Sequence, residues 1–241
     1  MDQAFSRTEM LLGKAAMEKL AASRVAVFGI GGVGGYVCEA LVRSGVGAFD
    51  LVDSDTVSLS NLNRQIIALR STVGRFKTEV MRERMLDINP AADVRVYNRF
   101  FLPENKDTFP FAEYDYVVDA VDTVSAKLAL AEAAAEYGIP LISAMGAGNK
   151  LDGSAFRVSD ISRTHTDPLA RVMRRELKKR GIEKLKVVWS DEPPLTPWRK
   201  ETEEDRPGKQ GRTPGSVAFA PSAAGLILAG EVIRDLTDGL R

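Results

Sequence analysis

A glycine-rich loop and an acid downstream of it are the first residues in the sequence whose types and spacing could do chemistry. The loop GIGGVG occupies residues 29–34, where glycines permit a tight turn and let backbone N–H groups approach phosphate oxygens closely. Asp53 lies nineteen residues beyond Gly34, the spacing from which a carboxylate accepts the ribose hydroxyl groups of a nucleotide. The pattern predicts a nucleotide site; the alternative is that the glycines serve only a tight helix–sheet contact.

Charged residues that follow Asp53 indicate which nucleotide this is. Asp55 comes next, Arg64 lies in the polar run SNLNRQ, and Lys77 follows VGRF. A redox enzyme that binds a dinucleotide is the default interpretation of such a loop, but hydride transfer does not need two cations there. A triphosphate carries about four negative charges that must be offset before it can be attacked. We therefore expect Arg64 and Lys77 to contact phosphates, although either one alone could be a solvated surface charge.

The elements that must position these residues alternate along the chain. Apolar runs predict strands at residues 25–28, 48–55, 93–100, 114–122 and 139–146, and helix composition predicts helices at residues 9–22, 36–45, 81–88 and 127–138. Such alternation implies an α/β fold with a doubly wound parallel sheet. The carboxyl ends of its strands share one edge, so Asp122, at the end of the fourth strand, is expected near the loop and could hold magnesium.

The remaining residues, 151–241, are expected to complete the domain whose core is residues 1–150. Patterning predicts strands at 154–162 and 186–190, a basic helix at 168–180, and a strand followed by a closing helix within 216–236. Residues 191–215 contain five prolines and three glycines. Such a stretch cannot bury a core, so it is expected to be a mobile loop.

The predicted helix 168–180 concentrates positive charge on a chain that is neutral as a whole. Lys and Arg number 33, and so do Asp and Glu, which argues against nucleic-acid binding through bulk charge. A local stripe on this helix is suited to phosphate backbones and predicts RNA contact; its residues are Arg171, Arg174, Arg175, Lys178 and Lys179. The alternative is an ordinary solvated face.

Cysteine content and hydropathy limit the other classes of protein. Cys38 is the single cysteine, which excludes an internal disulfide and a cysteine-rich zinc cluster, so no structural zinc is expected. Its position in a helix behind the glycine loop predicts a buried, inert thiol. The sequence has no basic-then-apolar leader and no run of eighteen apolar residues. We expect a reduced, cytoplasmic protein without membrane contact.

As an ordered set, the motifs resemble those of the adenylating family that contains the ubiquitin-activating enzymes and their ThiF-type, MoeB-type and HesA-type bacterial relatives. The resemblance rests on GIGGVG, VDSDTVSLSNLNRQ (52–65), VGRFK (73–77), INP (88–90) and VVDAVDT (117–123). It implies a Rossmann-like sheet in a homodimer and attack of a carboxylate on the α-phosphate of ATP. The implied nucleotide contacts are Gly29, Gly31, Gly32, Gly34, Asp53, Asp55, Asn61, Arg64 and Lys77. Catalytic roles fall on Arg64, Lys77 and Asp122, with Asp122 coordinating Mg²⁺.

Motifs of the second half are similar to one branch of that family, the tRNA threonylcarbamoyladenosine dehydratases. They are SAMGAGNKLD (143–152), DPLARVMRRELKKRGI (167–182), KVVWSDEPP (186–194) and TPGSVAFAPSAAGLILAGEVI (213–233). This resemblance implies that ATP activates the threonylcarbamoyl carboxylate on the adenosine beside the tRNA anticodon. The side chain then closes into a ring, and a sulfur-transfer partner protein is possible.

Three other functions stay open at this point. One is an adenylyltransferase that activates the C-terminal Gly-Gly of a ubiquitin-like sulfur-carrier protein, and such relatives commonly carry zinc cysteines that this chain lacks. Another is a nicotinamide-dependent oxidoreductase, and the third is a nucleotide-binding scaffold without turnover.

Overall fold

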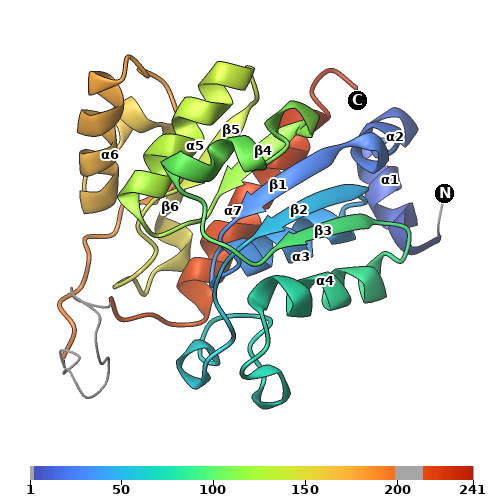
Figure 1. The fold of residues 1–241 in the computed structure, drawn as a ribbon, viewed down its shortest axis with the longest axis horizontal. Helices are drawn as coiled ribbons and strands as arrows, with labels where there is room; N and C mark the ends of the chain where they lie inside the picture. Colours follow the sequence, from blue (N-terminus) through green and yellow to red (C-terminus); the bar gives the residue numbers. More distant parts are fainter. Residues whose placement is uncertain (1–2, 199–213, 241) are drawn as a thin grey trace.

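The computed structural model describes residues 3–198 and 214–240, and its centre is a twisted sheet (Figure 1). The strands are ordered β3-β2-β1-β4-β5-β7-β6. Their bounds are β1 Arg24–Phe28, β2 Ala48–Val52, β3 Asp93–Tyr97, β4 Tyr116–Asp119, β5 Leu141–Ala144, β6 Phe156–Asp160 and β7 Lys186–Ser190. Every neighbouring pair is parallel except β6 and β7, which are antiparallel. The predicted doubly wound, mostly parallel sheet is confirmed.

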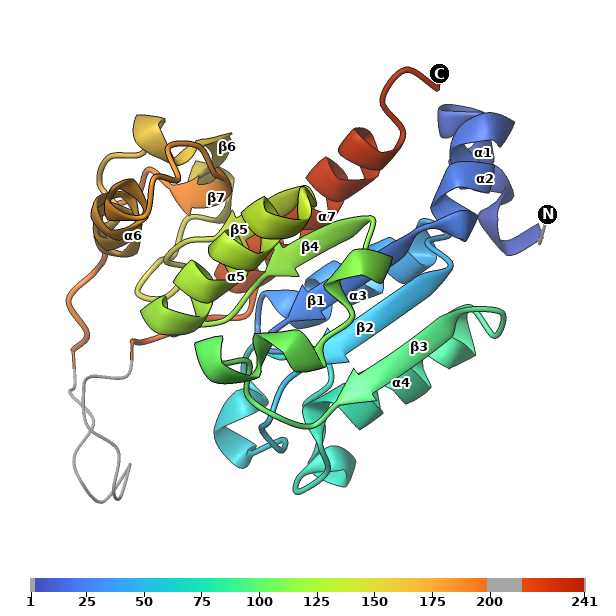
Figure 2. The same cartoon turned by 45° about the horizontal axis from the view of Figure 1, so that its top comes forward.

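Helices cover both faces of the sheet (Figure 2). They are α1 Ser6–Leu12, α2 Lys14–Ala22, α3 Gly34–Arg43, α4 Lys77–Ile88, α5 Val124–Tyr137, α6 Pro168–Lys179 and α7 Phe219–Leu236. Buried residues of α2, α3, α4 and α7 pack on one face, and those of α5 and α6 pack on the other. This arrangement leaves the carboxyl ends of β1, β2 and β4 at one edge of the sheet.

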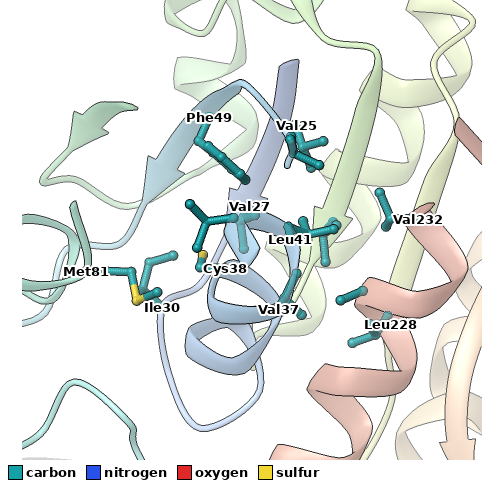
Figure 3. Close-up of a cluster of buried hydrophobic side chains, with 14 of the residues drawn as sticks. Val25, Val27, Ile30, Val37, Cys38, Leu41, Phe49, Met81, Leu228 and Val232 are labelled. Atoms are coloured by element: carbon teal, nitrogen blue, oxygen red, sulfur yellow. The ribbon is translucent and has the colours of Figure 1, made fainter. Parts of the chain in front are cut away.

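The core beneath the glycine loop is apolar and buried. Figure 3 shows Val25 and Val27 of β1 packed among side chains of two helices, which are Val37, Cys38 and Leu41 of α3 and Leu228 and Val232 of α7. Burying one such side chain contributes about 1.5–3 kcal/mol. Packing of this kind fixes α3 and α7 against β1, and so fixes the loop between β1 and α3.

Two of the predicted elements were wrong in detail. The single helix predicted over 9–22 is two helices, because Gly13 adopts a left-handed φ of 84° between α1 and α2. The strand predicted before the closing helix is not present, and residues 214–217 form neither strand nor helix. The helix begins at Phe219 because Pro221 lies in its first turn, where a missing N–H breaks no helical hydrogen bond.

The second half of the chain is continuous with the first in the sheet, since β7 pairs with β5. The division into residues 1–150 and 151–241 stays a prediction. Of the predicted loop 191–215, residues 191–198 and 214–215 form neither helix nor strand, and 199–213 lie outside the described residues. Within the described ranges, no helix is both long and apolar enough to cross a membrane.

Candidate functional site

The four glycines predicted to line a nucleotide fall into two pairs. A Cβ on Gly29 would lie 2.5 Å from the Ala120 carbonyl oxygen, and one on Gly34 would lie 1.8 Å from the Gly29 carbonyl oxygen. These two glycines are therefore required by backbone packing between β1, β4 and α3. Around Gly31 and Gly32, by contrast, a Cβ would meet nothing closer than 3.4 Å. The loop surface that remains free to approach a ligand is at Gly31 and Gly32.

Asp53 lies directly beside this loop. Its carboxylate accepts hydrogen bonds from the backbone N–H of Ile30 (2.7 Å) and of Asp55 (2.8 Å). Burial raises the pKa of the Asp53 carboxyl group above its usual value, with the Lys77 ammonium opposing that shift. The acid at the end of β2 is thus tied to the loop after β1, as the spacing of the motifs predicts.

Lys77 and Arg64 differ in their partners. Lys77 is buried at 6% exposure and donates to Asp55 (2.7 Å), and its Nζ lies 4.0 Å from Asp53. Asp55 therefore neutralises Lys77 in this structure. Arg64 donates to the Ser60 carbonyl oxygen (2.9 Å), and no carboxylate among the described residues lies within ion-pair distance of its guanidinium. Burial lowers the pKa of Arg64, so its charge is partly desolvated and not neutralised.

Asn61 and Gln65 flank Arg64 on the same turn. The Asn61 side-chain oxygen accepts the Ser58 N–H (3.1 Å), which closes the turn and leaves that oxygen engaged. Gln65 was not predicted as a site residue. It is 6% exposed, its carboxamide lies 3.9 Å from a Cβ placed on Gly31, and its buried Oε1 has no hydrogen-bond partner among the described residues. An unpaired acceptor beside the loop is a further candidate contact for a ligand.

Asp122 is exposed on the turn that follows β4. The preceding Ala120 donates its N–H to the Phe28 carbonyl oxygen (2.8 Å), which holds this turn against the end of β1. Across residues 3–198 and 214–240, no group of three or more His, Cys, Asp or Glu side chains could hold a metal ion. The assignment of Asp122 as a magnesium ligand stays a prediction.

A buried ion pair behind the turn was missed. Lys127 of α5 donates to Asp119 (3.0 Å) and to the Ala144 carbonyl oxygen (2.7 Å), and both charged residues are almost fully buried. Ser143 also donates to Asp119, and the other Asp119 oxygen accepts the Val121 N–H (3.1 Å). The pair joins the ends of β4 and β5. Lys127 in KLALAEAAAEY is indistinguishable in sequence from an exposed helical lysine, and Asp119 alone gives no signal.

Helix α7 completes the surroundings of the loop. A Cβ on Gly225 would lie 2.5 Å from the Val33 carbonyl oxygen, and one on Gly32 would lie 3.4 Å from Pro221. The C-terminal helix therefore packs directly on the glycine loop. Residues predicted from motifs far apart in the chain are thus assembled at one edge of the sheet.

A family model described as the ThiF family matches residues 5–239. The chain belongs to the ThiF family. The tRNA threonylcarbamoyladenosine dehydratase of Bacillus subtilis is 47% identical over 238 residues, which cover 96% of this chain and 94% of that relative. The match therefore includes the C-terminal half as well as the nucleotide motifs.

Solved structures of Escherichia coli tRNA N6-threonylcarbamoyladenosine dehydratase have the same fold as this ThiF-family chain. The complex with AMP has a TM-score of 0.87 at 34% identity and covers 97% of this chain and 94% of that chain. The complex with ATP has a TM-score of 0.86 at 35% identity, covering 97% and 93%. An adenylyltransferase and sulfurtransferase of Vanderwaltozyma polyspora is 38% identical over 132 residues, only 55% of this chain and 30% of that relative.

The single cysteine of this ThiF-family chain is buried in α3, as predicted. Burial raises the pKa of the Cys38 thiol far above its usual value. A thiol in this state is neither ionised nor accessible, so Cys38 is a core residue.

The basic stripe of helix α6 is divided by its contacts. Arg174 donates to the Thr164 carbonyl oxygen (2.6 Å) and anchors the preceding turn. Arg175 and Lys179 lie 3.0 Å and 2.9 Å from Glu176, whose carboxyl pKa they lower to about 2. The other two predicted RNA contacts, Arg171 and Lys178, are exposed and have no ion pair among the described residues. RNA binding by this helix stays a prediction, and Arg171 and Lys178 are its two candidate residues whose charge is not engaged by a contact among the described residues.

Proposed function

We propose that this chain is an ATP-dependent dehydratase that adenylates the threonylcarbamoyl carboxylate of a modified adenosine in tRNA and then cyclises it. The observation that carries the proposal is the similarity to the Bacillus subtilis dehydratase over 96% of the chain. The carrier-type relative matches 55% of the chain, so the second half favours the dehydratase over activation of a Gly-Gly carrier protein.

The geometry suits ATP. Asp53 accepts the ribose hydroxyl groups while its bond to Ile30 keeps it against the loop. The N–H groups around Gly31 and Gly32 face the phosphates, and the positive end of α3 adds to their attraction for anions. Gly29 and Gly34 support the loop by close packing rather than by contact with the ligand.

Arg64 and Lys77 supply the charge that the reaction requires. Within residues 3–198 and 214–240 no carboxylate pairs with Arg64, and its guanidinium is already partly desolvated, so it can engage a phosphate without breaking an ion pair there. Lys77 must share its charge with Asp55, so it offsets less phosphate charge than Arg64 does. Asn61 acts indirectly. Its side-chain oxygen accepts the Ser58 N–H and its carbonyl oxygen accepts the Arg64 N–H, so it fixes the turn that carries Arg64.

The reaction follows from what these groups stabilise. A carboxylate oxygen of the acceptor bonds to the α-phosphorus of ATP, the bond from that phosphorus to the bridging oxygen breaks, and pyrophosphate leaves. Arg64 and the loop N–H groups stabilise the charge that develops on the α-phosphate. A nucleophilic atom of the same modified adenosine then attacks the activated carbonyl carbon and releases its proton to solvent, and AMP leaves with one former carboxylate oxygen. The nucleoside has then lost the elements of one water. Ring closure of this kind uses no protein thiol, in keeping with a buried Cys38.

A magnesium ion fits the residues present. Mg²⁺ is usually held by one or two carboxylates together with substrate phosphates, rather than by a protein cage. Asp122 supplies one exposed carboxylate on the turn beside Gly29, and the nucleotide supplies the remaining oxygens. Bound there, the ion would offset phosphate charge.

We propose a cytoplasmic enzyme that recognises the anticodon stem-loop of tRNA through Arg171 and Lys178. A homodimer is also proposed, and the exposed side chains of Met10 (85%) and Leu11 (68%) on α1 favour it, because association would remove apolar surface from water. A sulfur-transfer partner protein stays a prediction.

The test is to incubate the protein with ATP, Mg²⁺ and one acceptor, either tRNA that carries threonylcarbamoyladenosine or a carrier protein that ends in Gly-Gly. AMP and pyrophosphate should form with the tRNA, whose modified nucleoside should lose the mass of one water. AMP formation that requires the carrier protein would identify the alternative function. Binding of NAD without ATP would indicate an oxidoreductase, and ATP binding without turnover a scaffold.

A further inference from the structure

Asn63 links the candidate phosphate ligand Arg64 to the segment that leads into α7. Its side-chain oxygen accepts a hydrogen bond from Arg64 Nη1 (2.9 Å), and its side-chain nitrogen donates to the Ser216 carbonyl oxygen (2.9 Å). Both ends of one carboxamide are used. A shift of the Arg64 guanidinium is therefore passed to the Ser216 backbone through a single side chain.

The Ser216 end of this link continues to the loop after β5. Gly215 N–H donates to Asn149 Oδ1 (2.7 Å), and Asn149 N–H donates to the Gly215 carbonyl oxygen (2.7 Å). The Asn149 carbonyl oxygen in turn accepts the Leu195 N–H (2.8 Å). Asn149 makes these contacts in a left-handed conformation with φ of 57°, which asparagine tolerates better than most residues. Leu195 and Gly215 are therefore both held by hydrogen bonds to Asn149.

Close packing makes this connection stiff. A Cβ on Gly148 would lie 2.7 Å from Pro214, and Gly225 allows α7 its close approach to the glycine loop. The segment 214–225 therefore touches the loop after β1 at one end and the loop after β5 at the other. A segment packed in this way responds to displacement at either end as a unit.

We propose that Asn63 is a positioning residue that couples ATP binding to the loop of residues 148–152, which follows β5. The inference rests on the proposed function, because the coupling acts when Arg64 engages a phosphate. That contact orders the guanidinium, which orders the Asn63 carboxamide and, through Ser216 and Gly215, the loop at Asn149. If Asn63 had only a structural role, its hydrogen bond to Ser216 would be equally strong with and without bound nucleotide. Coupling of this kind is a free energy shared between two sites.

The experiment measures hydrogen–deuterium exchange of two peptides in the full chain, residues 146–152 and residues 214–220, with and without a non-hydrolysable ATP analogue. In the native protein the analogue should slow this exchange by about fivefold or more. In Asn63→Ala the slowing should fall below about twofold. Asn63→Asp should lose it as well, because it keeps an acceptor for Arg64 but turns an oxygen toward the Ser216 carbonyl oxygen. The affinity of Asn63→Ala for the analogue should stay within about threefold of native, since Arg64 keeps its bond to Ser60.

Asn105→Ala is the matched control. The Asn105 carboxamide likewise bridges two backbone groups, the Leu102 N–H (2.9 Å) and the Phe100 carbonyl oxygen (2.8 Å), but neither belongs to the glycine loop or to residues 214–225. This variant should keep the native slowing. If the native chain binds the analogue without slower exchange, or if Asn63→Ala retains the slowing, the coupling role of Asn63 is refuted while the proposed function stands. A native chain that binds no analogue would refute both.

Discussion

The carboxylate of Asp53 accepts a 2.7 Å hydrogen bond from the backbone N–H of Ile30. An acid at the end of β2 is thereby joined to the loop that follows β1, so the two parts of the candidate nucleotide site are held in place before any ligand binds. Preorganisation of this kind reduces the entropy lost on binding. This position of the Asp53 carboxylate also has a cost, because burial disfavours its charged form and raises its pKa.

Asp53→Asn tests this conflict between stability and binding. Because the pKa of Asp53 is raised in the folded protein, its charge opposes folding once the pH exceeds the unfolded value of 3.8. The variant lacks this charge, but its carboxamide oxygen can accept only one of the two N–H hydrogen bonds that Asp53 accepts. The Tm of the variant relative to the native protein should therefore rise as the pH increases above 3.8. Its ATP affinity should fall by about tenfold or more, because a charged acceptor for the ribose is lost. Thermal scans across pH and calorimetry measure both, and an unchanged ATP affinity would remove Asp53 from the site.

Arg64→Ala should separate activity from stability. Arg64 makes no ion pair among the described residues, so its removal loses the hydrogen bonds to Ser60 and Asn63 but leaves no unpaired charge, and should lower the free energy of unfolding by only about 1–2 kcal/mol. AMP formation should fall by about 100-fold or more, because developing charge on the phosphate loses its main partner. Arg64→Lys keeps the charge without the planar fork and should recover only part of the rate. Native turnover in Arg64→Ala would show that the guanidinium is a solvated charge.

Lys127→Met should destabilise the fold strongly. The substitution leaves the Asp119 carboxylate buried without a cation, and loss of one partner of a buried pair costs about 3–5 kcal/mol. The double variant Asp119→Asn, Lys127→Met removes the stranded charge and should regain part of that loss. Urea unfolding measures both. A loss below about 1 kcal/mol in the single variant would mean that water reaches the pair.

Two pairs of charge reversals on α6 distinguish an RNA surface from a solvated face. Arg171→Glu with Lys178→Glu should weaken tRNA binding by about tenfold. The slope of the logarithm of the binding constant against the logarithm of salt concentration should fall by the amount expected for about two phosphate contacts. Arg175→Glu with Lys179→Glu changes the net charge equally, but at residues already paired with Glu176, and should weaken binding less. Filter binding across a salt series measures this. Equal effects of the two pairs would indicate bulk charge alone.

Alternating apolar and helical segments were sufficient to predict the sheet, because parallel strands buried on both faces must be apolar and must be joined by helices. The pairing of β7 with β5 and the antiparallel β6 could not be predicted, since they depend on contacts between distant segments. Gly13 and Pro221 show that the ends of helices could not be predicted reliably from the sequence. A glycine within a helical pattern can break it, and a proline can lie in a first turn, according to tertiary packing.

The arrangement of the candidate site residues could be predicted where their spacing reflects topology. The interval from the glycine loop to Asp53 is set by the crossover between β1 and β2, so the contact with Ile30 could be expected. Side chains that act by reaching across the fold gave no such signal. The carboxamide of Asn63, the unpaired oxygen of Gln65 and the ammonium of Lys127 acquire their roles only from what the fold places opposite them.

The central claim, attack of the acceptor carboxylate on the α-phosphorus, is tested most directly by an isotope transfer. tRNA whose threonylcarbamoyl carboxylate is labelled with heavy oxygen is incubated with unlabelled ATP and the protein, and the products are examined by mass spectrometry. We expect one labelled oxygen in AMP and none in pyrophosphate. Label that appears in inorganic phosphate or remains entirely in the tRNA, with no labelled AMP, would contradict the account.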